Sequence, residues 1–262
     1  MLLNRLLIKA VAPVPKIEKF KTYLFVAPHP DDIEIAVGST VARLAREGKD
    51  VYYLVCTDGR FGTEDENMSP ETLVKIRRDE QLASVKILGV KDVRFLPFED
   101  GGMYDEVALR IEIAKVIAEI KPDVVIGPDH KLYPESHPDH LRVGEAVSKA
   151  YFMCSNVNMM KSVGATQIAK PTVLAYYFTG KPNRFVKITK KDFEKTKAAY
   201  ACFVSQCPPP DNGKSLMLYM RLKVRLNGLR SFHIRADAFR VMNNMHIHCC
   251  GEAEDTAIRR PL

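Results

Sequence analysis

Short apolar runs alternate with amphipathic segments along the first half of the chain. The runs at residues 23–27 and 51–56 are continuous and apolar, as is usual for strands buried on both faces of a parallel sheet, and a further strand is predicted at 92–96. Between them, residues 35–47 and 70–88 carry apolar side chains at helical spacing, and each segment ends next to a glycine. The pattern therefore predicts consecutive βαβ units.

The same alternation continues, with a predicted helix at 106–120 and a predicted strand at 123–127. Further strands are expected at 172–178 and 184–188, followed by a helix at 191–204. Strands that alternate with helices favour an α/β fold, in which a Rossmann-like, mostly parallel sheet carries helices on both faces. Ligands of such folds bind at the carboxyl ends of the strands.

Length and composition agree with one compact unit. A chain of 262 residues with 46% apolar and 27% charged residues is typical of a soluble globular protein. We expect a single domain over residues 1–262, with a core at about 20–150 and a C-terminal β/α elaboration at about 151–262.

The chain offers no signal for a membrane or for export. It contains no uncharged apolar run of about 18 residues. The mildly apolar start is interrupted by Arg5 and Lys9 and lacks the core of a signal peptide. We therefore expect a cytoplasmic protein without a membrane partner.

The net charge of +7 is concentrated in the C-terminal part, where residues 181–240 hold 14 Lys and Arg against 4 Asp and Glu. Such an excess can mark a surface for nucleic acid, but this stretch lacks interleaved aromatic side chains and any known binding motif. A solvated or subunit-contacting face is the favoured interpretation, and we predict no nucleic-acid partner.

The six cysteines show no CxxC spacing and are too sparse for a secreted disulfide scaffold, so we interpret them as buried thiols. Cys249 and Cys250 are adjacent near the end of the chain, and a role in metal binding is a minor alternative for them.

One histidine and two carboxylates crowd a single turn directly after the first predicted strand. A mononuclear zinc enzyme needs about three nitrogen or oxygen ligands and an open position for water, and His29 and Asp32 supply two of the three. Asp31 is then suited to accept a proton from the water. The alternative is that Asp31 and Asp32 only cap a helix and that His29 lies on the surface of the turn.

A second cluster, His137-Pro138-Asp139-His140, lies beyond the strand predicted at 123–127 and opens another helix. His140 can supply the third zinc ligand, and His137 can donate to the oxyanion of a tetrahedral intermediate. Because both clusters are placed at the carboxyl edge of the sheet, a shared metal site is favoured over capping alone.

These clusters occur in the order found in a known family. The chain resembles the LmbE-like or PIG-L-type N-acetylglucosaminyl deacetylases, and the segment from Tyr133 to His140 is most similar to the archaeal diacetylchitobiose deacetylases. The resemblance rests on Ala27-Pro28-His29-Pro30-Asp31-Asp32, Thr57-Asp58-Gly59, Arg77, Glu80, Leu88-Gly89-Val90 and His137-Pro138-Asp139-His140.

The resemblance implies roles for the residues of these motifs. It implies Zn²⁺ bound by His29, Asp32 and His140. It also implies that Asp31 acts as the general base and that His137 is an assisting hydrogen-bond donor.

Outside those motifs, the implied roles are less sharply defined. Arg77 would bind sugar hydroxyls, although an ion pair with Asp79 or Glu80 on one helix is an alternative for it. Asp58 would line the pocket or simply form the turn. By position, His248 would match a histidine that the chitobiose group brings to the active site, and its neighbour His246 competes with it.

The predicted function is zinc-dependent hydrolysis of the acetamide of a small N-acetylglucosamine saccharide, with diacetylchitobiose as the leading substrate. Alternative substrates are an N-acetylglucosaminyl inositol, a thiol-precursor glycoside and a glycolipid. A non-catalytic α/β protein that binds nucleic acid or nucleotides is a remote alternative, since no G-x-G-x-x-G or P-loop follows the first strand. The resemblance also implies a homo-oligomer.

Overall fold

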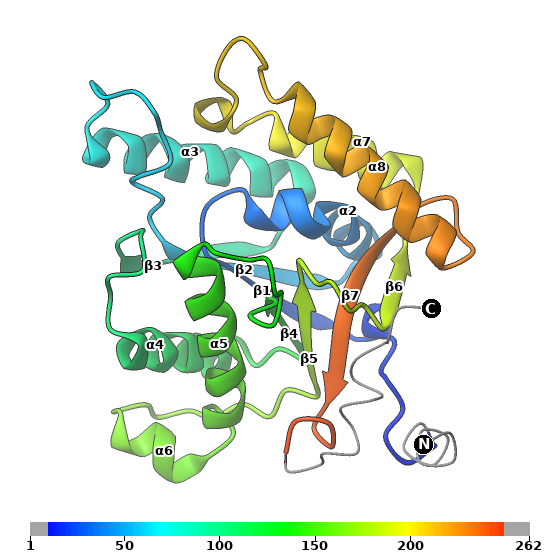
Figure 1. The fold of residues 1–262 in the computed structure, drawn as a ribbon. Coiled ribbons are helices and arrows are strands. Elements are labelled where there is room, and N and C mark those ends of the chain that lie inside the picture. Colours follow the sequence, from blue (N-terminus) through cyan, green and yellow to red (C-terminus); the bar gives the residue numbers. More distant parts are fainter. Residues whose placement is uncertain (1–9, 249–262) are drawn as a thin grey trace.

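A seven-stranded sheet forms the centre of the molecule in the computed structural model, which describes residues 10–248 (Figure 1). The strand order is β3-β2-β1-β4-β5-β7-β6. The strands are β1 (Thr22–Ala27), β2 (Asp50–Thr57), β3 (Asp92–Phe98), β4 (Val124–Pro128), β5 (Val173–Tyr177), β6 (Arg184–Lys187) and β7 (Ala236–Asn243).

Helices cover both faces of this sheet (Figure 1). The α-helices are α2 (Asp32–Arg46), α3 (Pro70–Leu88), α4 (Glu106–Ile120), α5 (Pro138–Met153), α6 (Val157–Ser162), α7 (Lys190–Tyr200) and α8 (Lys214–Arg230). Two short 3-10 helices, η1 (Ile17–Lys19) and η2 (Val204–Gln206), complete the elements.

Alternation along β1 divides the core into two layers. Tyr23, Phe25 and Ala27 pack with side chains of α2 and α3 on one face, whereas Leu24 and Val26 pack with those of α4 and α5 on the other. Successive strand side chains point to opposite faces, so a strand covered on both sides must be apolar throughout. This explains the continuous apolar runs of the sequence and confirms the predicted fold class.

The order in which strands are added to the sheet changes direction between β1 and β4: β2 and β3 lie on one side of β1, and β4 and β5 lie on the other. β1 pairs in parallel with β2 on one side and with β4 on the other. The loops after β1 and β4 therefore separate to opposite faces and leave room between them at the carboxyl edge of the sheet, which is where open α/β sheets bind ligands.

β7 differs from the other strands because it runs antiparallel to both β5 and β6. The sequence analysis did not predict β7, nor α8 before it, and it did not predict α6 within the polar stretch after α5. The orientation of β7 places its first residues at the carboxyl edge of the parallel strands and its last residues at the opposite edge.

The cysteines that the structure describes are free thiols. Cys56 and Cys154 are buried, as the composition predicted, whereas Cys202 and Cys207 are half-buried. Cys249 and Cys250 lie outside the described residues. Among residues 10–248, none of the helices has the length and apolar character needed to span a bilayer.

Candidate metal centre and active site

The loop after β1 holds its acidic residues in a strained turn. Asp31 has a φ of 99°, a region that residues other than glycine rarely adopt, and α2 begins at the next residue, Asp32. The Asp31 amide donates to the side-chain oxygen of Gln81 on α3 at 3.1 Å. Gln81 in turn donates to the buried carboxylate of Glu34 at 2.9 Å. Backbone strain of this kind is found where surrounding structure holds a functional residue in place.

Three side chains converge beside this turn: His29 from the loop after β1, Asp32 from the start of α2 and His140 from the first turn of α5. His29 Nδ1 lies 3.2 Å from one oxygen of Asp32, and His140 Nε2 lies 3.4 Å from the other. The three ligand atoms lie within 4.8 Å of one another, so one cation can contact all of them. Two imidazole nitrogens and one carboxylate are a donor set that suits catalytic zinc and leaves a coordination position open. The residues present therefore fit the metal that the sequence predicted.

Carboxylates behind both histidines orient their rings. His29 Nε2 lies 3.0 Å from Asp139 and 3.1 Å from Asp100, while His140 Nδ1 lies 2.9 Å from Glu135. A ligating histidine normally donates its second N–H to such a partner, which fixes the nitrogen that faces the metal. The outer contacts therefore leave His29 Nδ1 and His140 Nε2 facing the carboxylate of Asp32.

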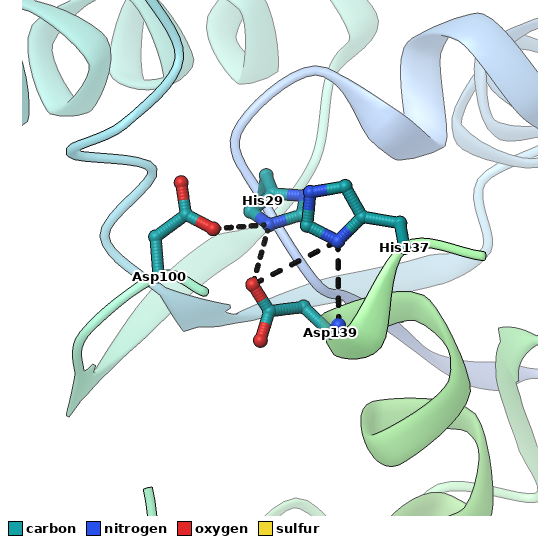
Figure 2. A group of neighbouring side chains, drawn as sticks. All are labelled: His29, Asp100, His137 and Asp139. Atoms are coloured by element: carbon teal, nitrogen blue, oxygen red, sulfur yellow. Dashed lines mark hydrogen bonds and ion pairs between the residues drawn. The ribbon is translucent and has the colours of Figure 1, made fainter. Parts of the chain in front are cut away.

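A second group of possible ligands shares His29 and consists of His29, Asp100, His137 and Asp139 (Figure 2). In this group, His137 Nδ1 accepts a hydrogen bond from the Asp139 amide at 3.3 Å and thereby caps α5. That nitrogen is engaged, and Asp139 also accepts from the Gly101 amide at 2.8 Å. The second group is therefore better suited to supporting His29 than to holding a metal.

Burial and neighbouring charges shift the pKa values of this site in opposite directions. Burial raises the pKa of Asp31 to about 7, although the positive charge of Arg77 works against the rise. Burial acts to lower the pKa of His140, but the carboxylates of Asp32 and Glu135 outweigh it and raise that pKa to about 9. Burial acts to raise the pKa of Asp32, but contact with His140 and His29 holds it well below its usual value. Two adjacent carboxylates thus have different proton affinities, a pattern typical of catalytic sites.

A cavity of about 410 Å³ opens beside the cluster of His29, Asp32 and His140. Its lining includes His29, Asp31, Asp32 and His137. Arg77 also borders it, but its guanidinium is buried and donates to the carbonyl oxygens of Pro30 at 2.7 Å and Gly59 at 3.1 Å.

Arg77 does not form the ion pair within its own helix that the sequence left open as an alternative. Its charge lies 3.6 Å from Asp31 rather than against Asp79 or Glu80. Arg77 therefore joins the loops after β1 and β2 at the edge of the cavity.

Asp58 forms a turn instead of lining that cavity. Its carboxylate accepts from the backbone and the guanidinium of Arg60, at 3.2 Å from the amide and 2.7 Å from Nη2. It also accepts from the Asp100 amide at 3.2 Å. Of the two roles considered for Asp58, these contacts favour the turn-forming one.

The structure does not bring His248 to the metal cluster. Its ring lies 6.0 Å from that of Phe152 on α5, and it borders a cavity formed by the ends of α4, α5 and β7. His246 is buried nearby and accepts from the Asn243 amide at 3.0 Å. Both histidines follow β7, and because β7 is antiparallel to its neighbours they emerge at the edge of the sheet away from His29.

The sequence analysis assigned no role to three side chains that contact the cluster: Asp100, Glu135 and Asp139. Asp100 follows β3 and could have been found by the rule that placed His29 and His140, since it also lies at the carboxyl end of a parallel strand. Glu135 carried no comparable signal, because it precedes its helix in an irregular loop.

Comparison with known proteins gives consistent relatives. Residues 24–151 match the family described as "PIG-L: GlcNAc-PI de-N-acetylase". The chain is 34% identical to the diacetylchitobiose deacetylase of Thermococcus kodakarensis over 95% of its own length and 92% of the relative's. It is 31% identical to a 1D-myo-inositol 2-acetamido-2-deoxy-alpha-D-glucopyranoside deacetylase of Kineococcus radiotolerans, over 61% of its length and 53% of that protein's.

The fold has a solved counterpart as well. The structure of N,N'-diacetylchitobiose deacetylase from Pyrococcus horikoshii, complexed with its inhibitor MPG, superposes with a TM-score of 0.85 at 30% identity. The superposition covers 95% of this chain and 94% of that one. Similarity over nearly the whole length, together with the motifs at the carboxyl edge of the sheet, confirms the predicted resemblance: this chain belongs to the PIG-L family of N-acetylglucosaminyl deacetylases.

Proposed function

We propose that this protein hydrolyses the acetamide of N,N'-diacetylchitobiose, with Zn²⁺ held by His29, Asp32 and His140. The observation that carries the proposal is the donor set within 4.8 Å, with the carboxylate of Asp31 beside it, in a chain 34% identical to a diacetylchitobiose deacetylase. When bound at such a site, zinc polarises a carbonyl oxygen and makes water more acidic.

Asp31 is the general base of this proposal. It borders the cavity next to Asp32 but makes no part of the cluster, so its carboxylate is available to the attacking water. A pKa of about 7 lets the group take a proton from water and return it to the departing amine at neutral pH. Arg77, 3.6 Å away, keeps the ionised form accessible despite burial.

His137 is the donor that stabilises the negative oxygen of the intermediate. Its Nδ1 accepts from the Asp139 amide, so the proton of the neutral ring belongs on Nε2. Burial and the charges of His29 and His140 lower the pKa of His137, which favours this neutral tautomer. A neutral ring can donate a hydrogen bond from Nε2–H to an oxyanion and still keep that proton.

Each of two cavities borders at least one of the proposed metal ligands, which supports a disaccharide rather than a monosaccharide. The 410 Å³ cavity borders His29 and Asp31, and a second cavity of about 320 Å³ borders His140. Phe178 and Tyr219 line the second cavity together with Glu135. Aromatic surfaces and carboxylates are the groups that commonly contact sugar rings and hydroxyls.

The homo-oligomer implied by the resemblance and the cytoplasmic location expected from the sequence stay predictions. The direct test of the function is acetate release from N-acetylglucosamine, diacetylchitobiose and N-acetylglucosaminyl inositol by metal-free protein, before and after one equivalent of zinc. We expect zinc-dependent release from the disaccharide. Release from the inositol glycoside alone would keep the chemistry and refute the proposed substrate.

Variants assign the roles in the same assay. Asp31→Asn is expected to bind zinc and lose turnover by about a hundredfold or more, as for loss of a general base. His140→Ala is expected to lose zinc affinity. Asp79→Asn, which changes an exposed carboxylate on α3, is the matched control and is expected to behave as wild type. Retained turnover in Asp31→Asn would remove Asp31 from the base role.

A further inference from the structure

Helix α2, which carries the metal ligand Asp32 at its start, is broken one turn later. Val37 has φ −148° and ψ 20°, values outside the helical region, and Gly38 and Ser39 follow it. Kinks commonly occur at such Gly/Ser pairs. The first turn of α2 therefore has its own direction, distinct from the rest of the helix, and that direction sets where the carboxylate of Asp32 lies.

A lysine from α8 binds the backbone on one side of the break. Lys223 Nζ donates to the carbonyl oxygen of Ala36 at 2.7 Å and also to that of Ile35. In a regular helix these two carbonyls accept from the amides four residues later, which belong to Ser39 and Thr40. The ammonium group thus contacts the last two acceptors of the first turn.

An aspartate from β7 binds the backbone on the other side. The Thr40 amide and hydroxyl both donate to Asp237 Oδ2, each at 2.8 Å. Asp237 is buried, and so is Thr40. Because the Thr40 amide would otherwise donate to Ala36, Asp237 and Lys223 together take the two halves of one helical hydrogen bond.

We infer that Lys223 and Asp237 are positioning residues for the metal centre, because they hold the first turn of α2 in the orientation that brings Asp32 to His29 and His140. The inference rests on the proposed metal centre. Both residues lie outside residues 24–151, the part that matches the family model. The inference therefore gives the C-terminal part of the chain a role in a site built by the core.

Charge is part of this arrangement. Burial lowers the pKa of Lys223 to about 8, while the negative charge of Asp237 acts to raise it. The ammonium group of this half-buried side chain needs acceptors for its protons, and here two carbonyls supply them. Replacing Lys223 by an apolar side chain therefore leaves the carbonyls of Ile35 and Ala36 without this donor, and the first turn can re-form a straight helix or fray.

The experiment measures zinc affinity of the metal-free protein by competition with a chelator, together with kcat and KM for diacetylchitobiose. Lys223→Met is expected to weaken zinc binding by about tenfold or more, the range known for groups that orient metal ligands. We expect kcat to fall and Lys223→Arg to recover part of both losses. Zinc affinity is the deciding measurement, because Lys223 also borders the 320 Å³ cavity and its replacement can change KM directly. Lys214→Met makes the same change at an exposed position of α8 and is expected to match wild type.

Asp237→Asn gives a second, milder test, because the amide oxygen of asparagine can still accept from Thr40 while the charge is lost. This variant replaces Lys223→Met in the test if Lys223→Met does not fold. A folded Lys223→Met or Asp237→Asn protein with wild-type zinc affinity and kcat would overturn the inference, even if its melting temperature were lower. Failure of wild type itself to bind zinc would instead refute the proposed metal centre, and it would be seen before any variant is compared.

Discussion

The ionised carboxylate of Asp31 should lower the free energy of unfolding of the protein. Its carboxyl is buried in the cavity wall, and its pKa rises from 3.8 to about 7. At about 1.4 kcal/mol for each pKa unit, this rise corresponds to an upper limit of about 4 kcal/mol of lost stability once the group is ionised. Asp31→Asn removes the charge and keeps the shape. The zinc-loaded variant should therefore lose turnover, while the metal-free variant should be more stable than metal-free wild type.

The sign of the pH dependence follows from where the proton is held. Between about pH 4 and pH 7 the folded wild type keeps a proton on Asp31 that the unfolded chain has lost. Its stability therefore falls as the pH rises through this window. The variant lacks that dependence, so its advantage should be absent below about pH 4 and complete above about pH 7.

Asp31→Gly separates backbone strain from charge. At φ 99° a glycine avoids a cost of about 1–2 kcal/mol, while it loses about 0.5–1 kcal/mol through the greater freedom of the unfolded chain. We therefore expect the glycine variant to be at least as stable as Asp31→Asn.

Urea unfolding of the metal-free proteins at about pH 5 and about pH 8 measures these differences, with Asp79→Asn as control. An asparagine variant no more stable than wild type at the higher pH would refute the reasoning. So would an equal gain at both pH values.

Three further predictions concern the surroundings of the site. Glu135→Gln should weaken zinc binding by about tenfold to a hundredfold, because it removes the charged partner of His140 Nδ1; unchanged affinity in a chelator competition would contradict this. Gly144→Ala should lower the free energy of unfolding by about 1–3 kcal/mol, since a Cβ there would lie 2.5 Å from the carbonyl oxygen of Pro128, and urea unfolding at wild-type stability would contradict it. Cys56 should resist thiol reagents in the native protein, because it is fully buried and burial raises its pKa; rapid labelling before unfolding would show otherwise.

The parallel part of the fold was predictable because its signals are local. The helix predicted at 106–120 has the bounds of α4, since Asp105 caps its first turn and Lys121-Pro122 follows its last. α8 gave no such signal: Leu218, Leu222 and Leu226 are half exposed, so its apolar residues do not mark a buried face. The direction of β7 depends on how that long connection returns to the sheet, which no local pattern records.

The convergence of the proposed metal ligands was predictable for a related reason. His29 and His140 both follow apolar strands, and parallel strands bring their carboxyl ends to one edge. The position of His248 could not be inferred in this way, because it depends on the direction of β7. The support from Lys223 and Asp237 was equally hidden, since a break inside α2 leaves only a Gly-Ser pair in the sequence.

The pairing of β1 with β4 has a consequence for the order of events during synthesis. The chain supplies His29 and Asp32 early, but His140 follows roughly a hundred residues later, and it reaches them only when β4 has paired with β1. His29 and Asp32 alone supply two donors and bind a cation weakly, so a nascent chain that has left the ribosome only as far as α4 has no complete site. Metal capture by the three proposed ligands must therefore wait until β4 has paired with β1 and α5 has begun to form.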